Sequence, residues 1–194
     1  MKKTTIILML SLLFAAVAAA DSEKLIFTEY GVSYASVLTP SIIANNSTGT
    51  FDTAAFDIKV GLSFLDKWVE AYAGAGFQAF IFTSNSQENY SFIPLCGGIK
   101  ANICPDWTVY PDVIFEYGRA ISNLRSQYMT DMGPMNRDNA WLADYYSFGV
   151  GMNWKIEDIA ILGLKIERPS YSNLNKSYGE IQVIKAGITW QIYY

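Results

Sequence analysis

The chain of 194 residues contains no histidine. Histidine is the usual general base that activates a serine or cysteine nucleophile, so its absence argues against most hydrolytic mechanisms. Histidine is also a common zinc ligand, and two cysteines, Cys96 and Cys104, cannot form a typical zinc site by themselves. We therefore predict a protein that is not an enzyme and that holds no metal or cofactor.

Positive charge and long apolar runs are also scarce. The chain has 14 Lys and Arg against 18 Asp and Glu, which argues against a nucleic-acid partner. After residue 20, no run of about 18 apolar residues occurs, so the sequence predicts no membrane-spanning helix. Before that point, Lys2 and Lys3 precede an apolar stretch that ends in three alanines. We predict a secretory signal peptide over residues 1–20 and a single domain over residues 21–194.

The two cysteines are expected to remain free thiols. If Cys96 and Cys104 lie on one extended strand, their separation of eight residues corresponds to about 26 Å. That distance is far beyond the reach of a disulfide bond.

Most of the remaining chain alternates apolar and polar residues with a period of two, which is typical of half-buried strands. Eight such segments are predicted, at residues 26–35, 55–65, 68–82, 92–103, 107–119, 146–156, 160–167 and 184–194. The connections at 66–67, 104–106 and 157–158 are short, whereas those at 38–52, 83–91, 120–143 and 168–177 are long and polar. Short turns at one end and long loops at the other are typical of outer-membrane barrels.

The alternation fits two kinds of barrel, a soluble lipocalin-like barrel and a membrane barrel, which place opposite faces inside. Here the charged face is also the small face, because ten of the 14 glycines lie on it: Gly31, Gly61, Gly74, Gly76, Gly98, Gly118, Gly149, Gly151, Gly163 and Gly187. An eight-stranded barrel has an interior just wide enough for side chains. We therefore predict an all-β fold, an eight-stranded antiparallel transmembrane β-barrel with up-and-down topology and its apolar face toward lipid.

The final residues, AGITWQIYY, resemble the C-terminal signal of bacterial outer-membrane barrels, with Gly187, Trp190, Ile192 and Tyr194 at the matching positions. The usual last residue of that signal is Phe, so Tyr is a mild departure. Over residues 21–194 the chain is most similar to the small OmpA/OmpX-like barrels, with no subfamily motif. The resemblance implies the outer membrane of a Gram-negative-type bacterium, both termini in the periplasm, and outer-membrane lipid and the barrel-assembly machinery as partners.

Charged residues on the predicted inner face form a first candidate site. The alternation predicts that the following charged side chains point into the lumen: Glu29, Asp57, Lys59, Glu70, Lys100, Glu116, Lys155, Lys165, Glu167 and Lys185. Buried charges have to be paired or hydrated, so the mixed signs favour a network of salt bridges across the lumen. Such a network is either a plug that stabilises the barrel or a gated ion path, and for eight strands we favour the plug.

The longest predicted loop, residues 122–143, is a second candidate site. It carries Arg125, Tyr128, Arg137 and Trp141, which are residue types enriched in protein interfaces. Loops on a rigid scaffold commonly carry recognition. The predicted function is a non-enzymatic outer-membrane barrel for envelope structure or surface interaction through its loops. The alternative is a small transport barrel for apolar or small solutes, of the OmpW kind, which a charged lumen disfavours.

Overall fold

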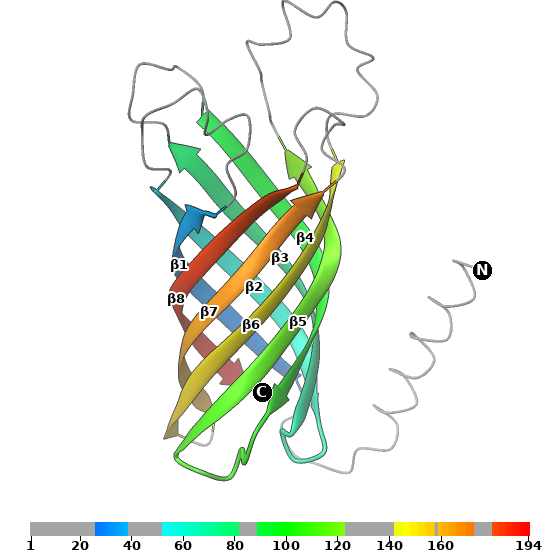
Figure 1. The fold of residues 1–194 in the computed structure, drawn as a ribbon. Helices are drawn as coiled ribbons and strands as arrows, with labels where there is room; N and C mark the ends of the chain where they lie inside the picture. Colours follow the sequence, from blue (N-terminus) through cyan, green and yellow to red (C-terminus); the bar gives the residue numbers. More distant parts are fainter. Residues whose placement is uncertain (1–25, 39–51, 82–88, 123–141, 158, 173–179) are drawn as a thin grey trace, which may run out of the picture.

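The computed structural model describes residues 26–38, 52–81, 89–122, 142–157, 159–172 and 180–194. These residues form eight strands: β1 (Ile26–Val37), β2 (Asp52–Phe64), β3 (Val69–Ile81), β4 (Asn89–Asn102), β5 (Val109–Ser122), β6 (Leu142–Glu157), β7 (Ala160–Ser172) and β8 (Ile181–Tyr193). Each strand pairs antiparallel with its neighbours in sequence, and β8 pairs with β1 (Figure 1). The predicted eight-stranded antiparallel barrel is confirmed.

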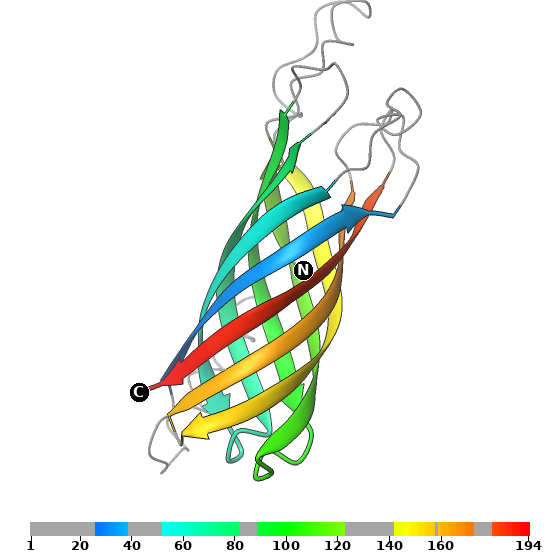
Figure 2. The same cartoon turned by 90° about the vertical axis from the view of Figure 1, so that its left-hand side faces the viewer.

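The strands run obliquely around the barrel (Figure 2). When cross-strand partners are followed once around the barrel from Phe64, the path returns to β2 at Ala54, an offset of 64 − 54 = 10 residues. For eight strands, a stagger of this size corresponds to a tilt of about 40°. The resulting interior is just wide enough to be filled by side chains. Within the described residues, no helix is long and apolar enough to cross a membrane.

The two faces of the strands divide as the alternation predicts. On β2, Ile58 and Val60 point outward and are 44% and 52% exposed, whereas Lys59 between them is 5% exposed. The lipocalin-like alternative, which needs the bulky apolar face inside, is therefore wrong. Small inner residues make room for large ones: a Cβ atom at Gly98 would lie 2.4 Å from the Tyr72 ring.

Several strands continue beyond their predicted ends on the loop side. β5 reaches Ser122, β6 begins at Leu142 and β7 reaches Ser172, so they extend into segments expected to be loops. The backbone pairing continues there, as in the pair Ile121 and Leu142, although several outward residues near these ends, such as Asp144 and Arg168, are polar. Alternation of apolar residues marks only the part of a strand that faces lipid, and the barrel wall is taller than that part.

The expectation that Cys104 lies on the same strand as Cys96 is wrong. β4 ends at Asn102, and Cys104 follows in the turn with a positive φ of 55°. Both cysteines are free thiols in the structure. The Cys96 side chain instead contacts the carbonyl oxygen of Gly74 on the neighbouring strand, at 3.7 Å.

Candidate functional site in the barrel lumen

The inner faces of seven strands place charged side chains in the middle of the lumen. Three pairs of opposite charge are direct cross-strand neighbours, namely Glu29 with Lys59, Glu70 with Lys100 and Glu167 with Lys185. Neighbouring opposite charges on one face of a sheet stabilise the pairing of the strands. Their local placement follows directly from the period-two pattern and the register of the barrel.

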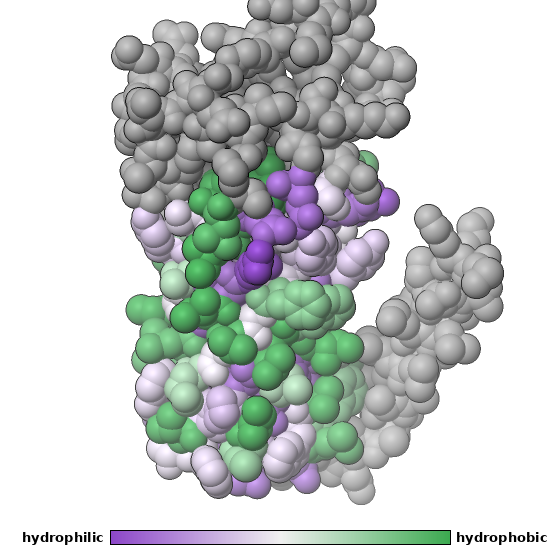
Figure 3. Space-filling view, in the orientation of Figure 1, coloured by the Kyte–Doolittle hydropathy of each residue, from purple (hydrophilic) through white to green (hydrophobic). Residues whose placement is uncertain are grey.

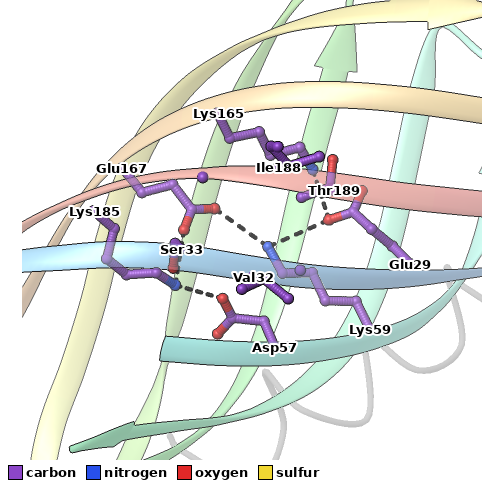
Figure 4. Close-up of a pocket in the computed structure, with 12 residues that line it drawn as sticks. Glu29, Val32, Ser33, Asp57, Lys59, Lys165, Glu167, Lys185, Ile188 and Thr189 are labelled. Atoms are coloured by element: carbon purple, nitrogen blue, oxygen red, sulfur yellow. Dashed lines mark hydrogen bonds and ion pairs between the residues drawn. The ribbon is translucent and has the colours of Figure 1, made fainter. Parts of the chain in front are cut away.

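Lys59 lies at the centre of this lumen network. Its ammonium nitrogen lies 2.7 Å from a carboxylate oxygen of Glu116, 3.3 Å from Glu167 and 3.7 Å from Glu29. A lysine ammonium has three hydrogen-bond donors, so three carboxylates match its capacity. Figure 4 shows Lys59 between Glu167 and Glu29, with its nitrogen directed at both.

Glu29 connects the centre of the lumen network to its turn side. Lys165 donates to Glu29 at 2.6 Å, and Lys100 lies 3.4 Å from it. Lys100 also lies 2.5 Å from Glu70 and donates to the side-chain carbonyl of Gln191. Two carboxylates are therefore bridged through one buried ammonium, which lowers the cost of removing each charge from water.

Lys185 completes the lumen network on the loop side. Its ammonium nitrogen lies 2.6 Å from Asp57 and 3.0 Å from Glu167. Through Glu167 it joins Lys59, so the ion pairs form one connected group. The members are Glu29, Asp57, Lys59, Glu70, Lys100, Glu116, Lys165, Glu167 and Lys185.

Lys155 is the one predicted lumen residue that the structure places outside the lumen network. It lies at an irregularity in the pairing of β6 with β7, where the register shifts between Lys155 and Glu157. Its side chain is half-buried near the turn-side end of the barrel. Its partner on β7 is Ile161, which is buried in the interior, so the register keeps Lys155 on the inward side of the strand.

Uncharged residues complete the hydrogen bonding of the carboxylates. The hydroxyl groups of Tyr72 and Tyr145 donate to Glu116 at 2.9 and 2.6 Å. Gln191 donates to Glu70 at 2.9 Å, and the Tyr193 hydroxyl donates to the same carboxylate. These four residues lie on the polar face of their strands, and that position was the available signal for them in the sequence.

Asp112 is a buried carboxylate beside the lumen network. Asn153 donates to one of its oxygens at 2.7 Å, while the other oxygen is buried without a hydrogen-bond partner. Among the described residues, no group of three or more acidic or cysteine side chains is arranged to hold a metal ion.

Two clusters of apolar and aromatic residues enclose the lumen network from above and below. The loop-side cluster consists of Ala35, Phe92, Ala120, Ala143, Tyr145, Tyr171, Ile181 and Val183. The turn-side cluster consists of Phe27, Tyr72, Tyr110, Ile114, Ile161 and Tyr193. In the loop-side cluster, the rings of Phe92 and Tyr171 stack with centroids 4.4 Å apart. Neither cluster was predicted from the sequence.

A small polar cavity remains beside the lumen network, at the seam of β1 with β8. Its lining includes Lys59, Glu167 and Lys185 together with the small residues Gly31 and Gly187 (Figure 4). Its free volume is that of about one water molecule. This cavity therefore has room for hydration of the neighbouring charges but not for a solute.

The predicted assembly segment lies on β8. Trp190 and Tyr194 point outward and are 39% and 63% exposed, and Ile192 points the same way. Gly187 faces inward, where a Cβ atom would lie 2.4 Å from the Ser33 side chain. The four residues chosen in the long loop, Arg125, Tyr128, Arg137 and Trp141, lie outside the described residues, as does the predicted signal peptide.

An apolar outer face around a closed, charge-filled lumen defines a small eight-stranded transmembrane β-barrel of the outer-membrane type. The solved structure of Neisserial surface protein A (NspA) is similar, with a TM-score of 0.60 and 7% identity over 87% of this chain and 97% of that one. The outer-membrane protein OprG from Pseudomonas aeruginosa has a TM-score of 0.50 and 9% identity over 89% and 99%.

A third similar structure is that of the outer membrane enzyme PagL, with a TM-score of 0.50 and 14% identity over 84% of this chain and 98% of that one. At these identities the likeness shows the fold alone, and the fold carries both enzymes and proteins of other kinds. No family model matches the chain. No curated protein matches it either.

Proposed function

We propose that this protein is a non-enzymatic barrel of a Gram-negative-type outer membrane, where it serves envelope structure or surface interaction. In this proposal both termini face the periplasm and the loops face outward. The barrel-assembly machinery recognises the last strand through Gly187, Trp190, Ile192 and Tyr194. Outer-membrane lipid surrounds the apolar face.

The filled lumen is the observation that carries this proposal. Five carboxylates and four ammonium groups form ion pairs in the middle, and a cluster with aromatic residues lies on each side of them. A transport barrel needs a continuous path or a ligand chamber, whereas the cavity seen here holds about one water molecule. The absence of histidine from the sequence further supports a role without catalysis.

The surface role assigns recognition to the loops. The segment 123–141 joins β5 to β6 and contains Arg125, Tyr128, Arg137 and Trp141. Connecting loops on a rigid scaffold generally tolerate changes in sequence and length. In this view the barrel wall is the scaffold, and residues 123–141 are the recognition segment.

Antibodies raised against a synthetic peptide of residues 123–141 test the orientation of the barrel. We expect them to label intact cells that express the full chain, and to lose that labelling when a short Gly-Ser turn replaces the segment. Labelling that appears only after the cells are permeabilised would show the opposite orientation. Normal heat-modifiable migration of the replacement variant serves as the control for folding.

Solute release from vesicles tests the transport alternative. Full-length protein is refolded into phosphatidylcholine vesicles loaded with a small sugar or a small aliphatic alcohol. We expect release at the rate of protein-free vesicles. Rapid release that depends on the protein would favour the small transport barrel instead.

A further inference from the structure

The outer face carries a polar patch on the loop side of β5 to β8. This outer patch consists of Arg119, Asp144, Tyr146, Arg168, Ser170, Glu180 and Gln182. Figure 3 shows hydrophilic residues gathered in the upper part of this face, with hydrophobic residues below them. Arginine on the lipid-facing side of a barrel is unfavourable in the middle of the bilayer and becomes tolerable near its interfaces.

The register places the outer patch toward the loop-side end of the barrel. On β5 the outward residue before Arg119 is Tyr117, and on β7 the outward residue before Arg168 is Ile166, which are 59% and 53% exposed. Beyond Arg168 the outward residues of β7 stay polar, whereas on β5 and β6 the exposed apolar residues Ile121 and Leu142 follow the patch toward the loops. In the proposed orientation the outer patch lies toward the outer-leaflet interface of the bilayer.

Near the loops, the outward residues of β1 to β4 differ from those of the outer patch. There β1 to β4 present Tyr34, Phe56, Phe77 and Leu95 outward, and all four are exposed and bulky. Toward the loops, the next outward positions on this side include Ser36 on β1 and Ser91 on β4, so polar residues are present there too. What distinguishes β5 to β8 is the pair of outward arginines, Arg119 and Arg168, which suits an anionic partner.

Contacts within the outer patch orient the two arginines. The guanidinium group of Arg119 lies 2.8 Å from Asp144, its direct partner on β6, and Arg168 donates to the side-chain carbonyl of Gln182. Glu180 accepts hydrogen bonds from Tyr146 and, at 3.1 Å, from Gln182. The Arg119 side chain nevertheless remains 59% exposed. A guanidinium has five N–H donors, so one carboxylate uses at most two of them.

We propose that the outer patch binds the phosphate of a phosphorylated glycolipid in the outer leaflet, with Arg119 and Arg168 as the phosphate ligands. Guanidinium groups match phosphate oxygens with paired hydrogen bonds and stay charged at any physiological pH. At headgroup depth, phosphate is the anion that meets them. Asp144 competes with that phosphate for Arg119, and the carboxylate of Glu180 interacts with the charge of Arg168. The inference rests on the proposed orientation, in which the loop side faces the outer leaflet.

Retention of lipid by the purified full-length protein tests this site. The protein is refolded into phosphatidylcholine vesicles that contain bis-phosphorylated lipid A, its dephosphorylated form, or phosphatidylglycerol, and bound lipid is counted by native mass spectrometry. We expect preferential retention of phosphorylated lipid A. The double variant R119Q/R168Q should bind it roughly 30-fold more weakly, because each cation near an anionic surface contributes about a factor of five.

Asp144→Asn separates a binding role from a structural one, because it should strengthen retention while any loss of folding would weaken it. Lys67→Gln, which removes a cation at the turn side, is the matched control and should leave retention unchanged. Three results would each overturn the proposal: equal retention by wild type and double variant, equal retention of the dephosphorylated lipid, or equal retention of phosphatidylglycerol. An oligomer that dissociates in the double variant without loss of lipid would assign the patch to a second copy of the chain.

Discussion

Ion pairs occur in both the lumen network and the outer patch. The two regions differ in how many hydrogen-bond donors of their cations are used within the protein. In the lumen, Lys59 meets three carboxylates and Lys100 meets two carboxylates and an amide, so their donors are used inside the protein. In the outer patch, Arg119 has one carboxylate partner and stays 59% exposed. Ion pairs of the lumen network therefore stabilise the barrel, whereas the arginine of the exposed pair in the outer patch remains available to a partner.

Deletion of Trp190 to Tyr194 should have the largest effect, and it should act through the lumen rather than the outer patch. Residues 190–193 pair with β1 and β7, and Gln191 and Tyr193 bond to Glu70. Gln182 and Glu180 of the outer patch remain in this variant. We expect no stable barrel, measured as loss of heat-modifiable migration. A normal heat-modifiable barrel would contradict this prediction, and Tyr194→Ala, which keeps both lumen partners, is the control.

Lys59→Met should be the most damaging single substitution in the lumen network. It removes an ammonium that lies within 3.7 Å of Glu29, Glu116 and Glu167 while nearly preserving side-chain volume. Leaving buried carboxylates unpaired costs about 3–5 kcal/mol of the free energy of unfolding. Urea unfolding in vesicles, followed by tryptophan fluorescence, measures the loss. Arg168→Met is the matched control on the outer face, and an equal loss in both variants would remove the difference between the two regions.

The nine network members among the predicted lumen residues were accessible from the sequence because period-two alternation and closure of the sheet determine which side chains point inward. Lys155 also pairs with an inward residue, Ile161, but it lies near the turn-side end of the barrel, away from the ion pairs of the lumen network. The loop-side and turn-side clusters were not predicted for another reason. Phe92 and Tyr171, for example, lie on β4 and β7, and only the register of the closed barrel brings their rings together. Arg168 and Ser170 of the outer patch fell in a segment predicted to be a loop, whereas Arg119 and Tyr146 lay at the ends of predicted strands, and alternation alone did not show that the patch residues share one part of the barrel wall.

Tyr145→Phe should cause a smaller loss of stability. The tyrosine hydroxyl donates to Glu116 at 2.6 Å in the buried interior, and a hydrogen bond to a charged group contributes about 1.5–3 kcal/mol. The urea midpoint should fall accordingly. Tyr117→Phe is the control, because this tyrosine is outward and 59% exposed, and it should leave the midpoint nearly unchanged. A midpoint unaffected by Tyr145→Phe would mean that this bond contributes nothing to the lumen network.

Arg119→Gln combined with Asp144→Asn should barely change the stability of the barrel. The pair is exposed, and such pairs contribute about 0–1 kcal/mol. Urea unfolding at low and high salt measures it, and the small difference should shrink as salt screens the charges. A loss comparable to that of Lys59→Met would show that the outer patch, too, is a structural element.

Tyr146→Phe should have the smallest effect, confined to one titration. The hydrogen bond from the Tyr146 hydroxyl holds the pKa of the Glu180 carboxyl below its usual value. A lowered pKa stabilises the folded state above the ordinary carboxyl pKa and loses that contribution as the pH falls through the folded value. In Tyr146→Phe the pKa of Glu180 should therefore rise, which NMR titration of the labelled carboxyl can measure. An unchanged titration would show that the bond has no influence on Glu180.

Conductance across a planar bilayer tests most directly whether the lumen is a plug. Full-length protein is inserted into a phosphatidylcholine bilayer in potassium chloride, and current is recorded across a range of voltages. The ion pairs around Lys59 and the stacked rings of Phe92 and Tyr171 predict no steady current above that of the protein-free membrane. A large, steady conductance from the wild-type protein would contradict the closed lumen and the function proposed from it.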